Sequence, residues 1–159
     1  MTKEQFLALT LKHQYLLNSV PKYQVVKNTC GLQAQFFNYP RHTLRIRATE
    51  KDQEWTQGLI KTWALRGTVH LINNDDYGLF MSVTPKTTYF DSWFTQEDIS
   101  VFGGLMLECI HNGINQKQEI AKCIRKHFKD EKKFEQAFSG WGGIFYILAN
   151  QGKIIFDSV

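Results

Sequence analysis

Apolar residues recur three and four positions apart up to residue 60, which is the spacing of helices that bury one face. Residues that commonly begin a helix, as an N-cap or as a first-turn proline, divide this stretch into segments: Thr2, Pro21, Pro40 and Asp52. Gly31 ends the second segment. The pattern predicts four short helices, over residues 2–18, 21–31, 40–48 and 52–60.

The period changes to that of strands at Thr62. Two short runs, residues 62–65 and 68–72, are rich in β-branched and apolar side chains and flank Arg66-Gly67. This arrangement predicts a β-hairpin in which Gly67 supplies the unusual backbone angle of the turn. Three or four short helices followed by a hairpin are the element order of a winged-helix unit.

The second half repeats this order with different residues. Its apolar periodicity predicts four further helices: over residues 77–83, up to Gly113, from an N-cap at Asn115, and through the apolar series between Phe134 and Leu148. Residues 153–156 then predict a strand. We interpret this strand as the first arm of a second hairpin whose other arm lies beyond the chain, with pairing to an earlier strand as the alternative.

A chain of 159 residues can fold as one ordinary domain or as two small ones. The repeated element order favours two. We therefore expect an α+β fold that is mainly α, built from tandem winged-helix units with short β-hairpin wings. The first unit is predicted over residues 1–74, and the second, truncated, over residues 75–159.

Composition adds limits on the class of protein. The sequence has no run of about 18 apolar residues, and Met1 is followed by polar residues rather than by a secretory leader. We expect a cytoplasmic monomer without membrane contact. The three cysteines lack the spacing of a disulfide framework or a zinc site, so we expect reduced, mostly buried thiols, no metal and no cofactor. The formal charge of +4 permits binding to a polyanion without requiring it.

Two glutamines stand one residue apart in the otherwise apolar stretch CGLQAQFFNYP. Gln33 and Gln35 are either loop residues that bond to water and backbone groups, or a pair that acts on a ligand. In a helix, residues i and i+2 point about 200° apart, so both amides can meet at one atom only in an extended segment or an irregular turn. Gly31 makes such a turn available.

Three segments together resemble the N-terminal signature of the AlkZ-like winged-helix family: GLQAQ at 31–35, Leu44-x-x-Arg47, and TWALRGTVHLINNDD at 62–76. The family comprises bacterial DNA glycosylases, including enzymes that unhook azinomycin-type cross-links, and relatives described only as winged-helix DNA-binding proteins. The resemblance implies a catalytic Gln-apolar-Gln motif made of Gln33 and Gln35, with Ala34 between them.

The sequence departs from this family in two ways. The proline that often follows the motif closely comes here only at Pro40, after Phe36-Phe37-Asn38-Tyr39. The family's full architecture, several winged-helix units and then a β-barrel, is longer than this chain. We therefore expect further C-terminal domains of the same protein, and we expect the chain alone to be weakly active or inactive.

The implied reaction suits amide side chains. A purine alkylated at N7 is already cationic, so it leaves the sugar without a general acid, and the sugar passes through an oxocarbenium-like state. Two amide carbonyls can hold the attacking water and place partial negative charge beside the developing cation. The resemblance thus implies excision of N-alkylated purines, or unhooking of cross-links, from double-stranded DNA.

Basic residues near the motif are candidates for DNA contacts. Arg41 and Arg45 are four residues apart on a predicted helix, Arg47 follows them, and Arg66 lies at the hairpin turn. They form either a solvated basic face or a phosphate-binding surface. Thr68 and His70 share one face of their strand and are the remaining candidates. A structural, hydrogen-bonded histidine is an equal alternative for His70.

A predicted helix over residues 116–133 is rich in lysine but also contains acidic residues, which favours solubilising charge over a second DNA surface. The leading hypothesis is the N-terminal part of a DNA glycosylase. The alternatives are a non-catalytic winged-helix DNA-binding or regulatory module, and a scaffold half that docks the remainder of the protein.

Overall fold

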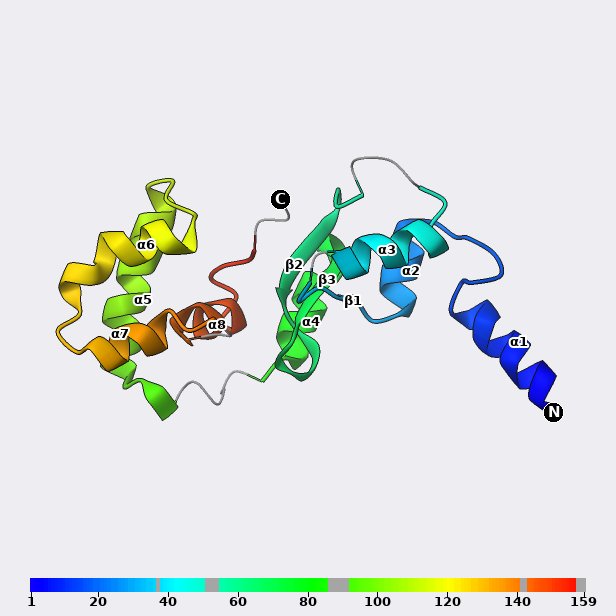
Figure 1. The fold of residues 1–159 in the computed structure, drawn as a ribbon, viewed down its shortest axis with the longest axis horizontal. Coiled ribbons are helices and arrows are strands. Elements are labelled where there is room, and N and C mark those ends of the chain that lie inside the picture. Colours follow the sequence, from blue (N-terminus) through cyan, green and yellow to red (C-terminus); the bar gives the residue numbers. More distant parts are fainter. Residues whose placement is uncertain (37, 51–54, 86–91, 141–142, 157–159) are drawn as a thin grey trace. The chain divides into compact units, whose positions relative to one another are not determined.

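The structure is a computed structural model of the chain that describes residues 1–36, 38–50, 55–85, 92–140 and 143–156. It is mainly helical, as the sequence predicted, and the predicted hairpin is part of a small three-stranded antiparallel sheet. Its contacts divide the chain into two compact units (Figure 1): unit 1 is Met1–Thr84 with the chain from Ile155, and unit 2 is Pro85–Ile154. Residues 75–84 therefore cluster with unit 1, and the predicted division into two winged-helix units stays a prediction.

Unit 1 contains the sheet and four of the described helices. The helices are α1 (Lys3–His13), α2 (Lys22–Asn28), α3 (Asn38–Arg47) and α4 (Tyr77–Val83). The strands are β1 (Leu32–Gln33), β2 (Leu59–Trp63) and β3 (Val69–Asn73), in the order β1-β3-β2. The core lies between the sheet and the helices α2 and α3, where Val25, Val26, Leu44 and Leu71 are buried.

Helix α1 is formed by local signals alone. Thr2 and Gln5 make a reciprocal capping box at its start, yet none of its residues is buried. Figure 1 shows α1 away from the sheet of unit 1, and Phe6, Leu7 and Leu9 are exposed on it.

The hairpin is predicted correctly, but its first strand is longer, its second strand begins one residue later, and the connection between them is longer than two residues. A short 3₁₀ turn at Leu65–Gly67 joins β2 to β3, with positive φ at Arg66 as well as at Gly67. The predicted fourth helix is wrong where it is described, because Leu59 and Ile60 begin β2. A short apolar run is compatible with a helix or a strand, and pairing with β3 makes this one a strand. The proposed cap, Asp52, lies outside the described residues.

Unit 2 is helical. It contains α5 (Gln96–His111), α6 (Lys117–Ile124), α7 (Glu131–Ala137) and α8 (Gly143–Asn150). Its core includes Met106, Ile120, Ile144 and Leu148. Gly103 permits the close approach of α5 to α8, because a Cβ there would lie 3.2 Å from Leu148 Cδ2.

Three predictions in the second half are wrong. Gln116, not Asn115, is the N-cap of α6. The lysine-rich segment is interrupted, since α6 ends at Ile124 and α7 begins at Glu131. The single helix from Phe134 to Leu148 is two helices, and α8 begins at Gly143, whose φ is 59°.

The predicted strand over residues 153–156 is reduced to a single bridge, which pairs it with an earlier strand. Phe156 makes an isolated antiparallel bridge with Lys61 of β2, where its N–H donates to the Lys61 carbonyl at 2.9 Å. Its ring lies 4.5 Å from that of Trp63. The alternative left open by the sequence, pairing with an earlier strand, is therefore what the structure shows. Among the described residues, no helix is long and apolar enough to cross a membrane.

Candidate active site

The two glutamines lie on an extended segment held by the sheet. Leu32 and Gln33 pair with Leu71 and His70 of β3, and the Ala34 N–H donates to the Val69 carbonyl at 2.7 Å. Ala34 is fully buried, and the side chains on either side of it point the other way. Gln33 Nε2 donates to Gln35 Oε1 at 2.7 Å. The two amides thus converge, in the extended geometry that the motif needs.

Gly31 sets the path from α2 into this segment. Its φ is 87°, its N–H donates to the Val26 carbonyl at 2.8 Å, and a Cβ there would lie 2.9 Å from Ile72 Cγ2. A larger residue would therefore meet both backbone strain and a close contact. Cys30 also has positive φ, at 54°. The turn that the sequence analysis assigned to Gly31 is thus made by two residues.

A row of polar side chains crosses the sheet beside the glutamines. His70 lies opposite Gln33 of β1 and opposite Thr62 of β2, so the three side chains share one face. His70 is only 4% exposed, and its Nδ1 is 2.9 Å from the Thr68 carbonyl oxygen. Because a carbonyl only accepts, this contact places the proton on Nδ1. His70 therefore has the structural hydrogen bond that the sequence left open, and Thr68 receives it.

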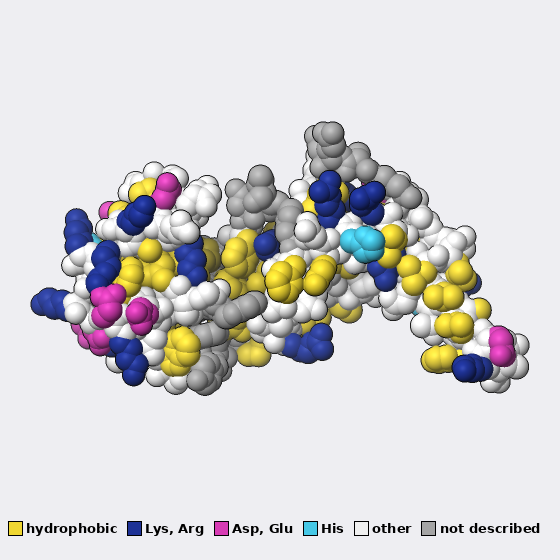
Figure 2. All heavy atoms as spheres, in the orientation of Figure 1, with side chains coloured by type: hydrophobic (Ala, Val, Ile, Leu, Met, Phe, Trp, Pro, Cys, Tyr) yellow, Lys and Arg dark blue, Asp and Glu magenta, His cyan; other side chains and the backbone are white. Residues whose placement is uncertain are grey.

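The four candidate arginines differ in surroundings. Arg41 and Arg45 are exposed on α3, and Arg66 is exposed at the hairpin connection. Arg47 is half-buried, and its Nε donates to the Gln14 carbonyl at 2.8 Å, so it ties α3 to the segment after α1. Figure 2 shows Lys and Arg side chains grouped over α3 with a histidine beside them. The assignment of these residues to DNA contacts stays a prediction.

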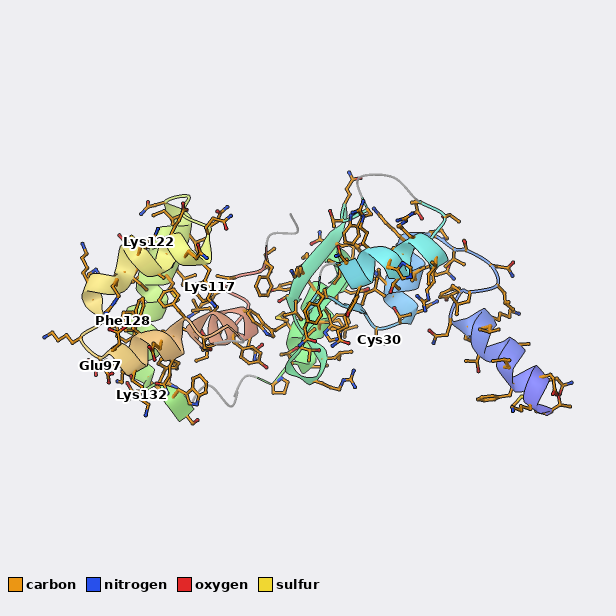
Figure 3. All side chains as sticks on the ribbon, in the orientation of Figure 1. Cys30, Glu97, Lys117, Lys122, Phe128 and Lys132 are labelled. Atoms are coloured by element: carbon orange, nitrogen blue, oxygen red, sulfur yellow. The ribbon has the colours of Figure 1, made fainter. Side chains whose placement is uncertain are left out.

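The basic residues of unit 2 make contacts within the unit or lie apart. Lys133 pairs with Asp98 at 2.8 Å, and Arg125 pairs with Glu131. Lys117 Nζ donates to the Ser139 carbonyl at 2.8 Å and lies 5.9 Å from the Phe145 ring centre. Figure 3 labels Lys117, Lys122 and Lys132, which are spread over the unit rather than converging. This arrangement agrees with solubilising and structural roles.

The three cysteines differ in burial. Cys109 is buried, whereas Cys30 and Cys123 are exposed, so the expectation of mostly buried thiols is wrong. Burial, aided by the neighbouring Cys123, raises the pKa of the Cys109 thiol to about 11. Within the described part of the chain, no group of three or more His, Cys, Asp or Glu residues is placed to hold a metal ion.

Comparison with known proteins gives two related matches. No protein-family model matches the chain. The chain is 26% identical to an "Interstrand DNA cross-link repair glycosylase" of Streptomyces sahachiroi, over 82% of this chain and 38% of that protein. The solved structure of the Streptomyces sahachiroi DNA glycosylase AlkZ matches with a TM-score of 0.65 at 24% identity. The chain is homologous to AlkZ. It covers 43% of the AlkZ structure, which in turn covers 91% of this chain.

The match to AlkZ agrees with the resemblance stated from the sequence, and it shows that this chain shares the fold of the matched part of that protein. Sequence reasoning did not find Thr62 as a neighbour of the motif. The strand period places Thr62 and His70 on faces of their own strands, but only the register of the sheet brings both into one row with Gln33.

Proposed function

We propose that this protein is a DNA glycosylase that excises N-alkylated purines or unhooks a DNA cross-link, with Gln33 and Gln35 positioning the attacking water. The observation that carries the proposal is the convergence of the two amides, at 2.7 Å, on a segment held extended by β3. Homology to a protein named as a cross-link repair glycosylase supports it. The proposed partner is double-stranded DNA.

The amide contact leaves acceptors for a water molecule. Gln33 uses one N–H toward Gln35, so its Oε1 remains an acceptor, and Gln35 Oε1 keeps a second lone pair. Two carbonyl oxygens can therefore hold one water and place partial negative charge beside a sugar that develops positive charge. Glutamine supplies no proton at neutral pH, so this chemistry favours a base that is already cationic over an undamaged one.

Positioning of the DNA is assigned to exposed arginines. Arg41 and Arg45 lie four residues apart on α3, which begins three residues after Gln35, so they share the helix face. Guanidinium groups bind phosphate oxygens through paired N–H donors. Contacts of this kind fix the register of a protein on the duplex without reading its sequence.

The test is excision by the full-length protein. Gln33→Ala and Gln35→Ala should each lower the rate of release of an N7-alkylguanine from duplex DNA by about 100-fold or more, because each removes a group that acts mainly in the transition state. DNA affinity and thermal stability should stay near wild type, since neither amide fills the core. Gln24→Ala, at an exposed position of α2, is the matched control and should excise normally.

Wild-type excision rates in both glutamine variants would make the pair ordinary loop residues. The protein would then be better described as a non-catalytic winged-helix DNA-binding or regulatory module, as the sequence analysis left open.

A further inference from the structure

His70 occupies the middle of the polar row, between Gln33 and Thr62. Residues directly opposite one another on antiparallel strands have Cβ atoms about 4.5–5.5 Å apart, so His70 is a cross-strand neighbour of both. The contact of Nδ1 with the Thr68 carbonyl, at 2.9 Å, fixes the ring and leaves Nε2 as its remaining polar atom. In the neutral ring with the proton on Nδ1, Nε2 is an acceptor.

Thr62 is a second, independent observation that favours a functional role for this row of polar side chains. Its side chain is fully buried, and Oγ1 has no hydrogen-bond partner among the described residues. A buried hydroxyl without a partner costs free energy, and valine has nearly the same shape. A polar side chain therefore stands beside His70 on this face where an apolar one of nearly the same shape would fit.

We propose that His70 is a positioning residue for Gln33, an inference that rests on the proposed function. In the productive geometry its Nε2 accepts the second amide N–H of Gln33, a bond that the structure does not itself contain, while the first is donated to Gln35 Oε1 as the structure shows. Both amide hydrogens of Gln33 are then occupied by the protein, and its Oε1 faces the water. Gln33 is exposed and would otherwise lose side-chain entropy each time it reaches the productive geometry.

Two substitutions of His70 separate this role from a structural one. Asparagine places an amide N–H near the Nδ1 position and can keep the bond to Thr68, whereas glutamine places its amide near the Nε2 position. In the full-length protein, His70→Asn should keep thermal stability and KM near wild type and lower kcat at least tenfold. His70→Gln should lose thermal stability but recover a larger share of kcat at temperatures where it is folded.

The control is Asn73→Ala, on the same strand and the opposite face, which removes bonds to the Tyr23 carbonyl and to Asp76. It should lower thermal stability without lowering kcat. If kcat instead follows thermal stability across all three variants, or if His70→Asn has wild-type kcat, the positioning role is overturned.

A readout without catalysis keeps the two proposals separate. In the full-length protein labelled with ¹⁵N, His70→Asn should move the side-chain amide signals of Gln33, and Asn73→Ala should not. If the wild type shows no excision, the proposed function fails and these signals alone decide on His70. Unchanged Gln33 signals in His70→Asn would then reject the contact.

Discussion

Gly31 combines two separate requirements, a positive φ and a close approach to β3. Its φ is 87°, and an added Cβ would lie 2.9 Å from Ile72 Cγ2 and 3.3 Å from the Leu71 carbonyl oxygen. Gly31→Ala should therefore lower the free energy of unfolding by about 2–3 kcal/mol, measured by urea denaturation. Gly58 has a similar φ of 77° with nothing within 4 Å of its added Cβ. Gly58→Ala should cost only about 1 kcal/mol, and equal losses in the two variants would contradict the role of the close contact.

Thr62 allows a prediction about stability alone. Because its buried hydroxyl lacks a described partner, Thr62→Val exchanges an unsatisfied polar group for an apolar one of similar shape. The free energy of unfolding should stay unchanged or rise by up to about 1 kcal/mol. A loss of 2 kcal/mol or more in the same denaturation measurement would mean that the hydroxyl is bonded in solution.

At the scale of elements, α5 and α7 are joined through one carboxylate. Asp98 accepts from the Thr95 N–H at 2.9 Å in the capping box of α5, and from Lys133 Nζ of α7 at 2.8 Å. Burial acts to raise the pKa of Asp98, but the hydrogen bonds from Lys133 and Thr95 together outweigh it, so the pKa lies below its usual value. The carboxylate form is therefore favoured in the folded state.

Because the pKa of Asp98 is lower in the folded state, its contribution to stability decreases at low pH. The stability from Asp98 is fully present above its unfolded pKa of about 3.9 and is lost as the pH falls through the lower folded value. Asp98→Asn should lower the melting temperature at pH 7, and the gap from wild type should narrow as the pH is taken below about 4. Glu135→Gln, at an exposed position of α7, is the control and should melt like wild type. A gap that is constant with pH would show that the charge of Asp98 is irrelevant.

Elements defined by neighbouring residues were the predictable ones. The hairpin around Arg66-Gly67 and the helix over residues 77–83 were found because alternation, turn residues and apolar spacing are local signals. Leu59 and Ile60 were assigned to a helix because a short apolar run has no clear period. They form a strand by pairing with residues of β3 that lie ten or more positions away in the sequence. The two-residue strand β1 exists only through β3 and has no local signal at all.

In the candidate site, too, the features with a local sequence signal were predicted and those that depend on tertiary contacts were not. Gln33 and Gln35 were identified from their spacing and the family resemblance, and the sequence required either an extended segment or an irregular turn for them to meet. Thr62 and the burial of His70 depend on strand register and packing, which no single segment encodes. Arg47 was grouped with Arg45 by position, but its bond to the Gln14 carbonyl is a tertiary contact.

At the scale of the whole molecule, Arg41 and Arg45 differ in surroundings from the basic residues of unit 2. Arg41 and Arg45 are exposed on the helix that follows the glutamine segment. In unit 2, Lys117, Arg125 and Lys133 contact groups of their own unit, and Lys129 and Lys132 are exposed beside acidic residues. A net charge of +4 cannot distinguish these groups, but DNA binding measured against salt concentration can.

The double variant Arg41→Ala, Arg45→Ala should weaken binding of the full-length protein to duplex DNA about tenfold or more at low salt, because charge-assisted bonds to phosphate are among the stronger hydrogen bonds. Each lost phosphate contact should flatten the slope of log affinity against log salt by about 0.9, so the pair should flatten it by about 2. The loss should be similar for unrelated DNA sequences, since phosphates carry no sequence information. Lys129→Ala, Lys132→Ala removes the same charge from unit 2 and should change neither quantity. An equal effect of the two double variants would indicate a general effect of charge. An unchanged slope for the Arg41 and Arg45 variant would mean that these arginines are solvated and do not contact phosphate.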